Sequence, residues 1–529
     1  MNQAIIFGVS LIILVVAFFV FKNNNRFFSR FIKTLAVIYF AWAFFRFMLA
    51  DSFIWVINKG IYSGTYYEST DVLQSVLRWG QYISYVVLPM ACFFNSRLFK
   101  NLAIYFCLPF TILNTIFFAD FMQYFMGVGM EAGRGIQLSE ALRATYFSVE
   151  LILGIIIPLL FVVVEKYHFN VKSKTEWRNF FVALPFVILA LIPVYIPQSF
   201  IGYTNITTTT LTIGNLIWWA ITITEIIVLY LVFRFRPYRE RYMICMFLAL
   251  ALFMHYNSLY LMGFTVARLP IQLCNLGAYF FVVALILKNR GFFNFVFLAN
   301  VVGTLIAMIM PDTEGGFAGF WNVHFLIEHM QVLVIPILCM LLRIFPRVDK
   351  SALKHLVIGF SCYFVFCWIS GTILNAYALE GGYGKVNFFY IFDLEKAFDY
   401  FPFISFTQNI HWVLFGKFEI WPVFQLMVYG GFLLLCLLFY FLVLKIYVVL
   451  DDHFELRKAR IDMIEKITGK KLNLKRDYDP DDIDPKQKQQ IEKQKQQQKQ
   501  QQIEEQQQIE KQQQIDGQQQ IDGQKQKTN

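Results

Sequence analysis

Charged residues are scarce in this 529-residue chain: Asp, Glu, Lys and Arg make up 16% of it, while hydrophobic residues make up 57%. A soluble globular domain carries about 25% charged residues, because its surface must be solvated. The composition therefore excludes a soluble globule and predicts a protein whose solvent is largely the lipid bilayer.

Several chemical signatures are also missing. No G-x-x-x-x-G-K-[ST] loop occurs, which disfavours ATP-driven transport by this chain alone. The eight cysteines lack paired zinc-type spacing apart from a loose pair, Cys362 and Cys367, so neither a disulfide framework nor structural zinc is predicted. The formal net charge is +10, but the basic residues fall in short clusters between apolar runs, so no nucleic-acid partner is predicted.

Long apolar segments are abundant. A helix that crosses a hydrocarbon core of about 30 Å needs roughly 20 apolar residues. The sequence therefore predicts an all-α, polytopic membrane bundle of about thirteen helices. They lie near residues 4–21, 31–50, 80–95, 101–121, 145–164, 178–198, 211–234, 242–263, 269–287, 292–310, 324–345, 353–377 and 424–449. The first lacks a basic segment before it and a cleavage site after it, so we expect a retained helix.

Basic residues mark every second connection between these segments. They gather at 22–33, 97–100, 166–178, 234–241, 288–290 and 343–354, and again at 457–471 after the last span. The intervening connections are acidic, mixed or uncharged. Because Lys and Arg accumulate on the cytoplasmic side, this pattern predicts a multi-pass cell-membrane protein with its N-terminus outside and its C-terminus in the cytoplasm.

A weak internal repeat links the two halves of the membrane region. Glu150 and Pro158 lie eight residues apart, as do Glu328 and Pro336, each pair on a span running from outside to inside. This favours a parallel duplication of spans one to six in spans seven to twelve, with coincidence among apolar helices as the alternative. In a duplication, Leu151 stands where the second copy has a histidine.

These patterns divide the chain into four parts. Residues 1–204 form a six-helix membrane half, 205–450 a second membrane domain, 451–477 a charged juxtamembrane helix, and 478–529 a Gln/Lys-rich tail. Isoleucines in the tail recur every six residues, a period that forms no continuous helical face, and the composition predicts disorder. Such a tail is suited to cytoplasmic protein partners.

Polar residues inside apolar spans are costly, so they are candidates for function. Cys274 opens the ninth predicted span and His329 lies in the eleventh; both spans run inward, which places both side chains in the outer half of the membrane. A histidine can draw the proton from a thiol and leave a thiolate that attacks an ester carbonyl. Gln272 and Asn275 are candidate donors to the resulting oxyanion, and Glu328 is a candidate to orient a histidine.

Simpler roles stay open for these residues. A membrane cysteine is more often a packing residue than a nucleophile, and a membrane histidine often joins two helices. His255 in the eighth span and Asn375 at the end of the twelfth are further supporting polar residues. His324 lies about one turn above His329, but this set lacks the additional carboxylates of a metal site, so no metal or other cofactor is predicted.

A family resemblance rests on motifs in order along the chain. These are Leu269-Pro-Ile-Gln-Leu-Cys274-Asn-Leu, Ile327-Glu-His329, Asn375-Ala-Tyr377 and Trp421-Pro422. Over about residues 205–450 the chain resembles the YwaF-type bacterial integral membrane proteins, which are similar to eukaryotic ether-phospholipid acyltransferases and, in fold, to androgen-induced-gene lipid hydrolases. The resemblance implies Cys274 as the acyl-accepting nucleophile and His329 as base. Gln272 stands where many members have histidine, which leaves that position's role open.

Three functions stand as hypotheses. The first is a thiol-dependent acyltransferase or hydrolase that acts on membrane lipids in the outer half of the bilayer. The second is a non-enzymatic transporter or lipid-handling protein whose halves form a pathway. The third is a membrane anchor whose tail recruits partners. Close approach of Cys274 and His329 favours the first, and a polar midplane cavity between the halves favours the second.

Overall fold

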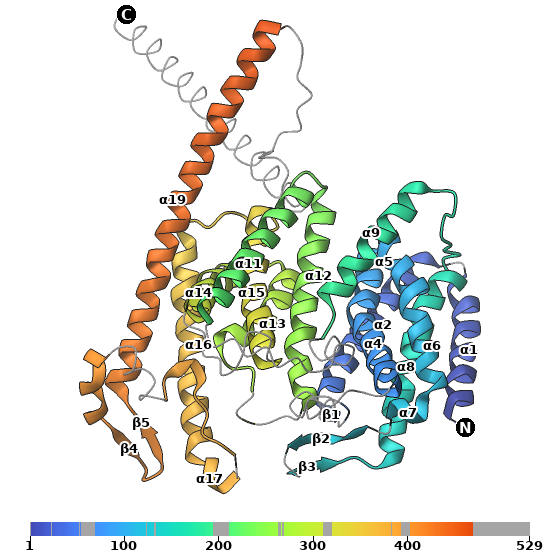
Figure 1. The fold of residues 1–529 in the computed structure, drawn as a ribbon, viewed down its shortest axis with the longest axis horizontal. Coiled ribbons are helices and arrows are strands. Elements are labelled where there is room, and N and C mark those ends of the chain that lie inside the picture. Colours follow the sequence, from blue (N-terminus) through green and yellow to red (C-terminus); the bar gives the residue numbers. More distant parts are fainter. Residues whose placement is uncertain are drawn as a thin grey trace, which may run out of the picture.

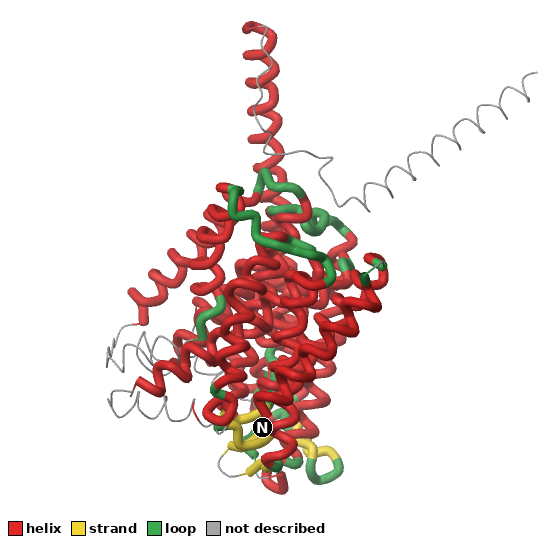
Figure 2. The backbone as a smooth tube through the Cα atoms, turned by 90° about the vertical axis from the view of Figure 1, so that its right-hand side faces the viewer, coloured by secondary structure: helices red, strands yellow, loops and turns green. Residues whose placement is uncertain are grey.

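The computed structural model describes twelve stretches of the chain. They are residues 2–22, 24–51, 53, 69–122, 124–131, 134–193, 211–262, 266, 269–309, 320–381, 383–392 and 402–468. The predictions made for the Gln/Lys-rich tail, and for the last residues of the juxtamembrane helix, lie outside them. Within these stretches the chain forms a bundle of long helices packed side by side (Figures 1 and 2).

The described residues of the first half form nine helical segments. They are α1 (Asn2–Phe21), α2 (Asn25–Phe47), α4 (Ser69–Phe94), α5 (Arg97–Leu102), the π-helix η1 (Ala103–Cys107), α6 (Leu108–Ile116), α7 (Phe118–Met122), α8 (Glu140–Val163) and α9 (Lys174–Ala190). The segments α5, η1 and α6 follow one another without a break and together cover one predicted span.

The second half contributes the helices that hold the candidate site. They are α11 (Leu211–Phe233), α12 (Tyr238–Asn257), η2 (Ser258–Met262), α13 (Leu273–Leu287), α14 (Arg290–Ile309), α15 (Phe320–Leu341), α16 (Ser351–Ala376), α17 (Ala378–Gly381), η4 (Phe388–Tyr390), η5 (Pro402–Asn409) and α19 (Pro422–Thr468). The helix α19 continues well beyond the bundle at the end opposite to the start of α1 (Figure 1).

Every predicted span overlaps a helix within the described residues, which confirms the all-α polytopic class. Ten of the described helices are long and apolar enough to cross a membrane, and α13, with 15 residues, is a shorter apolar helix. Large apolar side chains cover their outer faces, for example Leu11 at 63% and Phe19 at 73% exposed on α1. Exposing so continuous an apolar surface to water would be unfavourable, whereas lipid chains solvate it. The chain is therefore a multi-pass membrane protein.

The helix α12 lies at the centre of the bundle, where the two halves meet. Every residue from Ile244 to Asn257 is buried. The helix α4 packs on α12 from the first half, and α13 and α15 pack on it from the second. Phe253 of α12 lies against Phe40 of α2 with ring centroids 4.8 Å apart. A helix apolar on all sides is suited to such a core position.

The same helix pairs pack in both halves. In the first half α1 packs on α8, α2 on α4, and both α2 and α4 on α8. In the second half α11 packs on α15, α12 on α13, and both α12 and α13 on α15. The four helices named in each half therefore pack in the same pairwise pattern.

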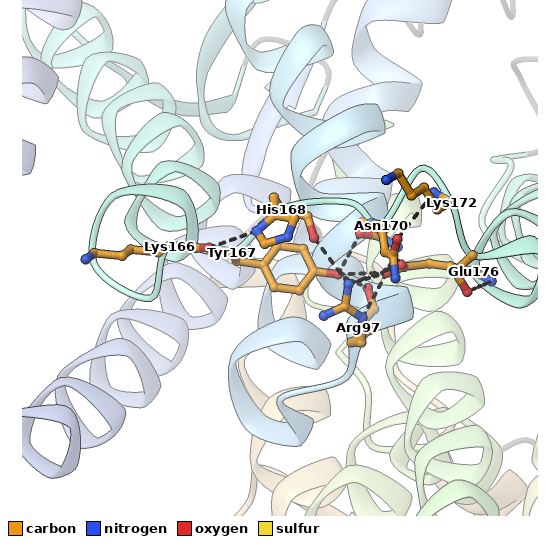
Figure 3. Close-up of polar contacts among 9 residues, drawn as sticks. Arg97, Lys166, Tyr167, His168, Asn170, Lys172 and Glu176 are labelled. Atoms are coloured by element: carbon orange, nitrogen blue, oxygen red, sulfur yellow. Dashed lines mark hydrogen bonds and ion pairs between the residues drawn. The ribbon is translucent and has the colours of Figure 1, made fainter.

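A matching ion pair also recurs at the basic end of each half. Arg97, the first residue of α5, lies 2.8 Å from the Glu176 carboxylate and donates a hydrogen bond to the backbone oxygen of His168 (Figure 3). Arg290, the first residue of α14, lies 2.6 Å from the Asp349 carboxylate and donates to a backbone oxygen in the loop after α15. The first pair joins the start of α5 to the first turn of α9, and the second joins the start of α14 to the loop before α16.

Acid should weaken both ion pairs. Burial by itself raises the pKa of Glu176, but hydrogen bonds from Asn101 and Arg97 hold this pKa below its ordinary value of 4.5. A hydrogen bond from Ser351, aided by Arg290, holds the pKa of Asp349 below 3.8. A depressed carboxyl pKa stabilises the fold above the ordinary value, and this contribution is lost as the pH falls through the folded-state pKa.

We therefore expect Glu176→Gln to destabilise the detergent-solubilised protein near neutral pH and to make its unfolding temperature less sensitive to acid. Because Arg97 is 56% exposed, the loss should be only about 0.5–1 kcal/mol. Thermal unfolding from pH 7 down to pH 3 measures it. Lys174→Gln, an exposed neighbour, is the control. A pH profile unchanged by Glu176→Gln would contradict the assignment.

Two small sheets, which the sequence did not predict, lie at the end of the bundle away from the extension of α19 (Figure 2). The strands β1 (Leu49–Asp51), β2 (Phe125–Glu131) and β3 (Arg134–Gln137) form an antiparallel sheet, and β4 (Trp412–Leu414) and β5 (Phe418–Ile420) form a hairpin. Strands of three to seven residues give too short an alternation to stand out among long apolar helices.

Candidate functional site

The helices α13 and α15 run in the same direction and approach each other at a glycine. A Cβ atom added at Gly277 of α13 would lie only 3.2 Å from Cγ2 of Val332 on α15. Cys274 precedes Gly277 by three residues, and His329 precedes Val332 by three. At a rise of about 1.5 Å per residue, both side chains therefore start about 4.5 Å above this contact, on the same level.

Cys274 lies in the first turn of α13. The helix starts here because the preceding residue, Gln272, is extended, with φ −57° and ψ 142°. The backbone N–H groups of Cys274 and Asn275 lie near the sulfur, and the Asn275 side-chain oxygen is 3.3 Å from it. These N–H groups and the positive end of the helix dipole favour a negative charge on the sulfur, whereas burial and the nearby Glu328 carboxylate oppose it.

Cys274 is also accessible. It is partly exposed and Cys362 is exposed, whereas the other six cysteines are buried. Cys362 lies on an exposed face of α16. Partial exposure is one of the conditions that a nucleophilic cysteine needs.

Glu328 of α15 lies within electrostatic range of this cysteine. The Glu328 side chain is 5% exposed and interacts electrostatically with Cys274, Tyr256 and Tyr279. Within the described part of the chain, its oxygen Oε1 has no hydrogen-bond partner. Sequence analysis missed both tyrosines, because tyrosine is common in membrane helices and gives little signal by itself.

His329 occupies the neighbouring position on α15. Val332 follows Glu328 by four residues and His329 by three. Glu328 and His329 therefore lie one turn from Val332, on the face of α15 that Gly277 of α13 approaches. His329 is 3% exposed, and its Nδ1 lies 2.7 Å from the backbone oxygen of Phe325. A carbonyl oxygen only accepts, so Nδ1 carries the hydrogen and Nε2 keeps a lone pair that can take a proton.

His255 joins α12 to α15 beside this site. Its ring stacks on the ring of His324 at 4.5 Å, and its Nε2 donates to the backbone oxygen of His324 at 3.2 Å. Asn257 donates to the backbone oxygen of Phe253 and accepts a hydrogen bond from Tyr279. These contacts stabilise helix packing. No metal-binding group of three or more His, Cys, Asp or Glu side chains occurs among the described residues.

Gln272 and Asn375 bind the loop of residues 383–392 through hydrogen bonds to its backbone. Gln272 donates to the backbone oxygen of Asn387 at 2.6 Å and accepts from the N–H of Phe389 at 2.8 Å. Asn375 donates to the backbone oxygen of Val386 at 2.9 Å and accepts from its N–H at 2.7 Å. Side-chain amides here satisfy backbone groups of a loop that lacks regular hydrogen bonding. Both are positioning residues in this structure.

A third amide, Gln425 of α19, also binds this loop, and sequence analysis missed it. It is fully buried and donates to the backbone oxygen of Ile391 at 3.2 Å. The loop side chains Phe388 and Ile391 are buried, so the loop enters the end of the bundle rather than lying over it. The sequence feature that could have identified Gln425 is a polar amide in the first turn of an apolar span.

A comparison with protein families finds a match in the second half of the membrane region. The model of the TMEM164 family, a family of membrane proteins, matches residues 207–443. This stretch contains Cys274, Glu328 and His329 and the helices that position them. No curated protein and no solved structure matches the chain.

Proposed function

We propose that this multi-pass membrane protein, whose residues 207–443 match the TMEM164 family, transfers or hydrolyses an acyl group of a membrane lipid. The supporting observation is the placement of Cys274, in the first turn of α13, level with Glu328 and His329 of α15. The proposal includes the YwaF-type relationship. It also includes the predicted orientation, in which this site faces the outer half of the bilayer and the N-terminus is outside.

The reaction would begin at the lipid ester. Nε2 of His329 takes the proton of the Cys274 thiol, and the thiolate attacks the ester carbonyl carbon. Backbone N–H groups in the first turn of α13 donate to the oxyanion. The carbon–oxygen ester bond then breaks, a thioester forms, and the alkoxide leaves with the proton that His329 returns. The products of this half-reaction are the acylated cysteine and a lysolipid.

The second half-reaction restores the cysteine. A hydroxyl group of another lipid, or water, gives its proton to His329 and attacks the thioester carbonyl. The carbon–sulfur bond breaks and the sulfur takes the proton back. A lipid hydroxyl gives acyl transfer, and water gives hydrolysis. Glu328 lies close enough to influence the charge on the sulfur and is proposed as a positioning residue.

Trapping the thioester tests the proposal. The full-length protein would be reconstituted in vesicles with a phospholipid that carries a labelled acyl chain. We expect label on the protein that neutral hydroxylamine removes, because hydroxylamine cleaves thioesters readily and oxygen esters slowly. Failure to label Cys274, together with an unchanged lipid pool, would contradict the proposal.

The neighbouring residues on α15 should differ in their effects. We expect His329→Gln to lower acylation about 10²–10⁴-fold, because the general base is lost. In the wild type the rate should fall at acid pH, because a protonated histidine cannot accept a proton, and this fall should be absent from the variant. Glu328→Gln keeps the shape and should cost less than His329→Gln. Rates of Cys274 acylation across pH measure both. A larger loss with Glu328→Gln would identify the carboxylate as the base instead.

The described residues give less support to transport. A cavity between the halves touches Tyr82 and Leu191 on one side and Met254 and His255 on the other. Its volume is about 10 Å³. A cavity of this size holds about one water molecule, which is too little for a solute pathway in this conformation.

A further inference from the structure

A cavity of about 650 Å³ opens at the basic end of the bundle, on the opposite side of the membrane from the cysteine site. The helices α2, α4 and α8 form its walls, and Arg239 from the first turn of α12 lies at its edge. In the predicted orientation this end faces the cytoplasm. The cavity is the right size for a small-molecule or headgroup site.

The rim of this cavity is cationic. Lys33, Lys166 and Arg239 line it, and none of these three forms an ion pair within the described stretches. Glu165 is the one acidic lining residue, and it pairs with Lys100, which is buried behind it. The lining therefore sums to three positive charges and one negative charge, and that negative charge already has a partner.

The arrangement keeps Lys166 available for a ligand. Its loop is fixed by contacts of the neighbouring residues, in which Tyr167 and Arg97 bind Glu176 (Figure 3). The Lys166 side chain points away from these contacts (Figure 3). Lys166 itself has a positive φ of 52°, which turns it out of the helical path after α8.

The inner wall of the cavity is apolar. Phe28 and Ile32 of α2, Cys92 of α4 and Phe161 of α8 line it, and each is at most 5% exposed. A cationic rim above an apolar wall matches an amphipathic anion, such as a phospholipid, better than a fully hydrated ion.

The other half of the protein fills the corresponding space with its own side chains. Tyr242 lies in the second turn of α12, as Ser29 does in α2. Tyr242 donates to the backbone oxygen of Leu285 on α13, and Lys288 lies 4.7 Å from its ring. In the first half the small Ser29 leaves the space between α2 and α4 open. The cavity is therefore a specific difference between two similarly packed halves.

We propose that this cavity binds the phosphate headgroup of an anionic glycerophospholipid from the leaflet at the basic end of the bundle. Lys33, Lys166 and Arg239 contact the phosphate, and the glycerol and the upper acyl chain lie along Phe28 and Phe161. The site is separate from the proposed acyl-transfer site, and binding there does not depend on that chemistry.

Lipid binding to the full-length protein tests this site. Native mass spectrometry of the protein in mild detergent would be used to titrate phosphatidylglycerol and, separately, phosphatidylcholine. Basic residues near a membrane surface contribute about 1 kcal/mol each to binding an anionic lipid, which is about fivefold in affinity. We expect Lys33→Gln, Lys166→Gln and Arg239→Gln together to weaken phosphatidylglycerol binding about a hundredfold.

The matched control removes the same charge elsewhere. Arg26→Gln, Arg30→Gln and Lys172→Gln are exposed basic positions outside the cavity, and their combination should leave the affinity within about threefold. Equal losses in the two triple variants would overturn the proposal, because they would show only a general attraction to charge.

A second variant tests the cavity itself. Ser29→Tyr copies the filled half and should abolish the tight phosphatidylglycerol site, whereas Ser29→Ala should keep it. Unfolding temperatures without added lipid show whether both variants fold. Wild-type affinity in folded Ser29→Tyr would overturn the proposal. Displacement by inorganic phosphate as effectively as by a short-chain phosphatidylglycerol would overturn the lipid assignment in favour of a free phosphate ion.

Discussion

Replacing Cys274 with alanine should abolish acyl transfer, with a loss of about a thousandfold or more, because a nucleophile has no substitute in a covalent mechanism. The hydroxylamine-sensitive label on the protein should disappear as well. Cys274→Ser keeps the shape but presents a weaker nucleophile, so any label that forms should resist neutral hydroxylamine. Acylation of the reconstituted protein measures both effects.

Cys362→Ala is the control for this experiment. Cys362 is the exposed cysteine on α16, and its replacement should change neither the label nor the rate. Comparison of cellular phospholipid acyl chains between the parent and a Cys274→Ala strain extends the test to the membrane. Normal acyl-chain profiles and undiminished labelling in folded Cys274→Ala would contradict the proposed function.

Replacing Arg78 with methionine should destabilise the first half by about 3–5 kcal/mol, because it leaves the buried Asp51 carboxylate with only the more distant Arg46 as a cationic neighbour. Arg78 lies 3.0 Å from Asp51, and Arg46 lies 3.9 Å from Asp51 and 3.8 Å from Glu150. All four are at most 1% exposed. Two positive and two negative charges thus balance in a buried cluster, where an unpaired charge is costly.

A double variant separates charge pairing from packing. Arg78→Met combined with Asp51→Leu removes both partners, so we expect it to recover most of the stability that Arg78→Met loses. Arg30→Gln, an exposed basic residue of α2, is the control and should have little effect. Thermal unfolding of the purified proteins measures the series. A fully stable Arg78→Met protein would show that this cluster contributes little.

The two glutamates of the repeated pattern differ in their surroundings, and this difference bears on function. Oε1 of Glu150 accepts hydrogen bonds from Gln81 at 2.8 Å and Tyr85 at 2.5 Å, and Arg46 lies near its other oxygen. Glu328 has no ion pair within the described structure, and its Oε1 has no hydrogen-bond partner there. Glu150 therefore stabilises the packing of the first half, whereas Glu328 remains available to a substrate or to the cysteine.

The sequence by itself determined the class of the protein and the positions of its spans. Twenty apolar residues in a row have only one stable solution in lipid, a helix that satisfies its own backbone, and this holds whatever its neighbours are. For the same reason the level of Cys274 and His329 could be predicted, since it follows from the helical rise counted from the membrane boundary.

Only the tertiary structure decided which side chains meet. The rotation of α13 against α15 is set by the Gly277–Val332 contact, and neither hydropathy nor spacing encodes it. The same is true of Gln272, which has the chemistry of an oxyanion donor but binds the loop at Asn387. The open cavity beside Ser29 likewise depends on three helices packing together. Hydrophobicity acts locally through the solvent, whereas side-chain neighbours depend on how whole helices cross.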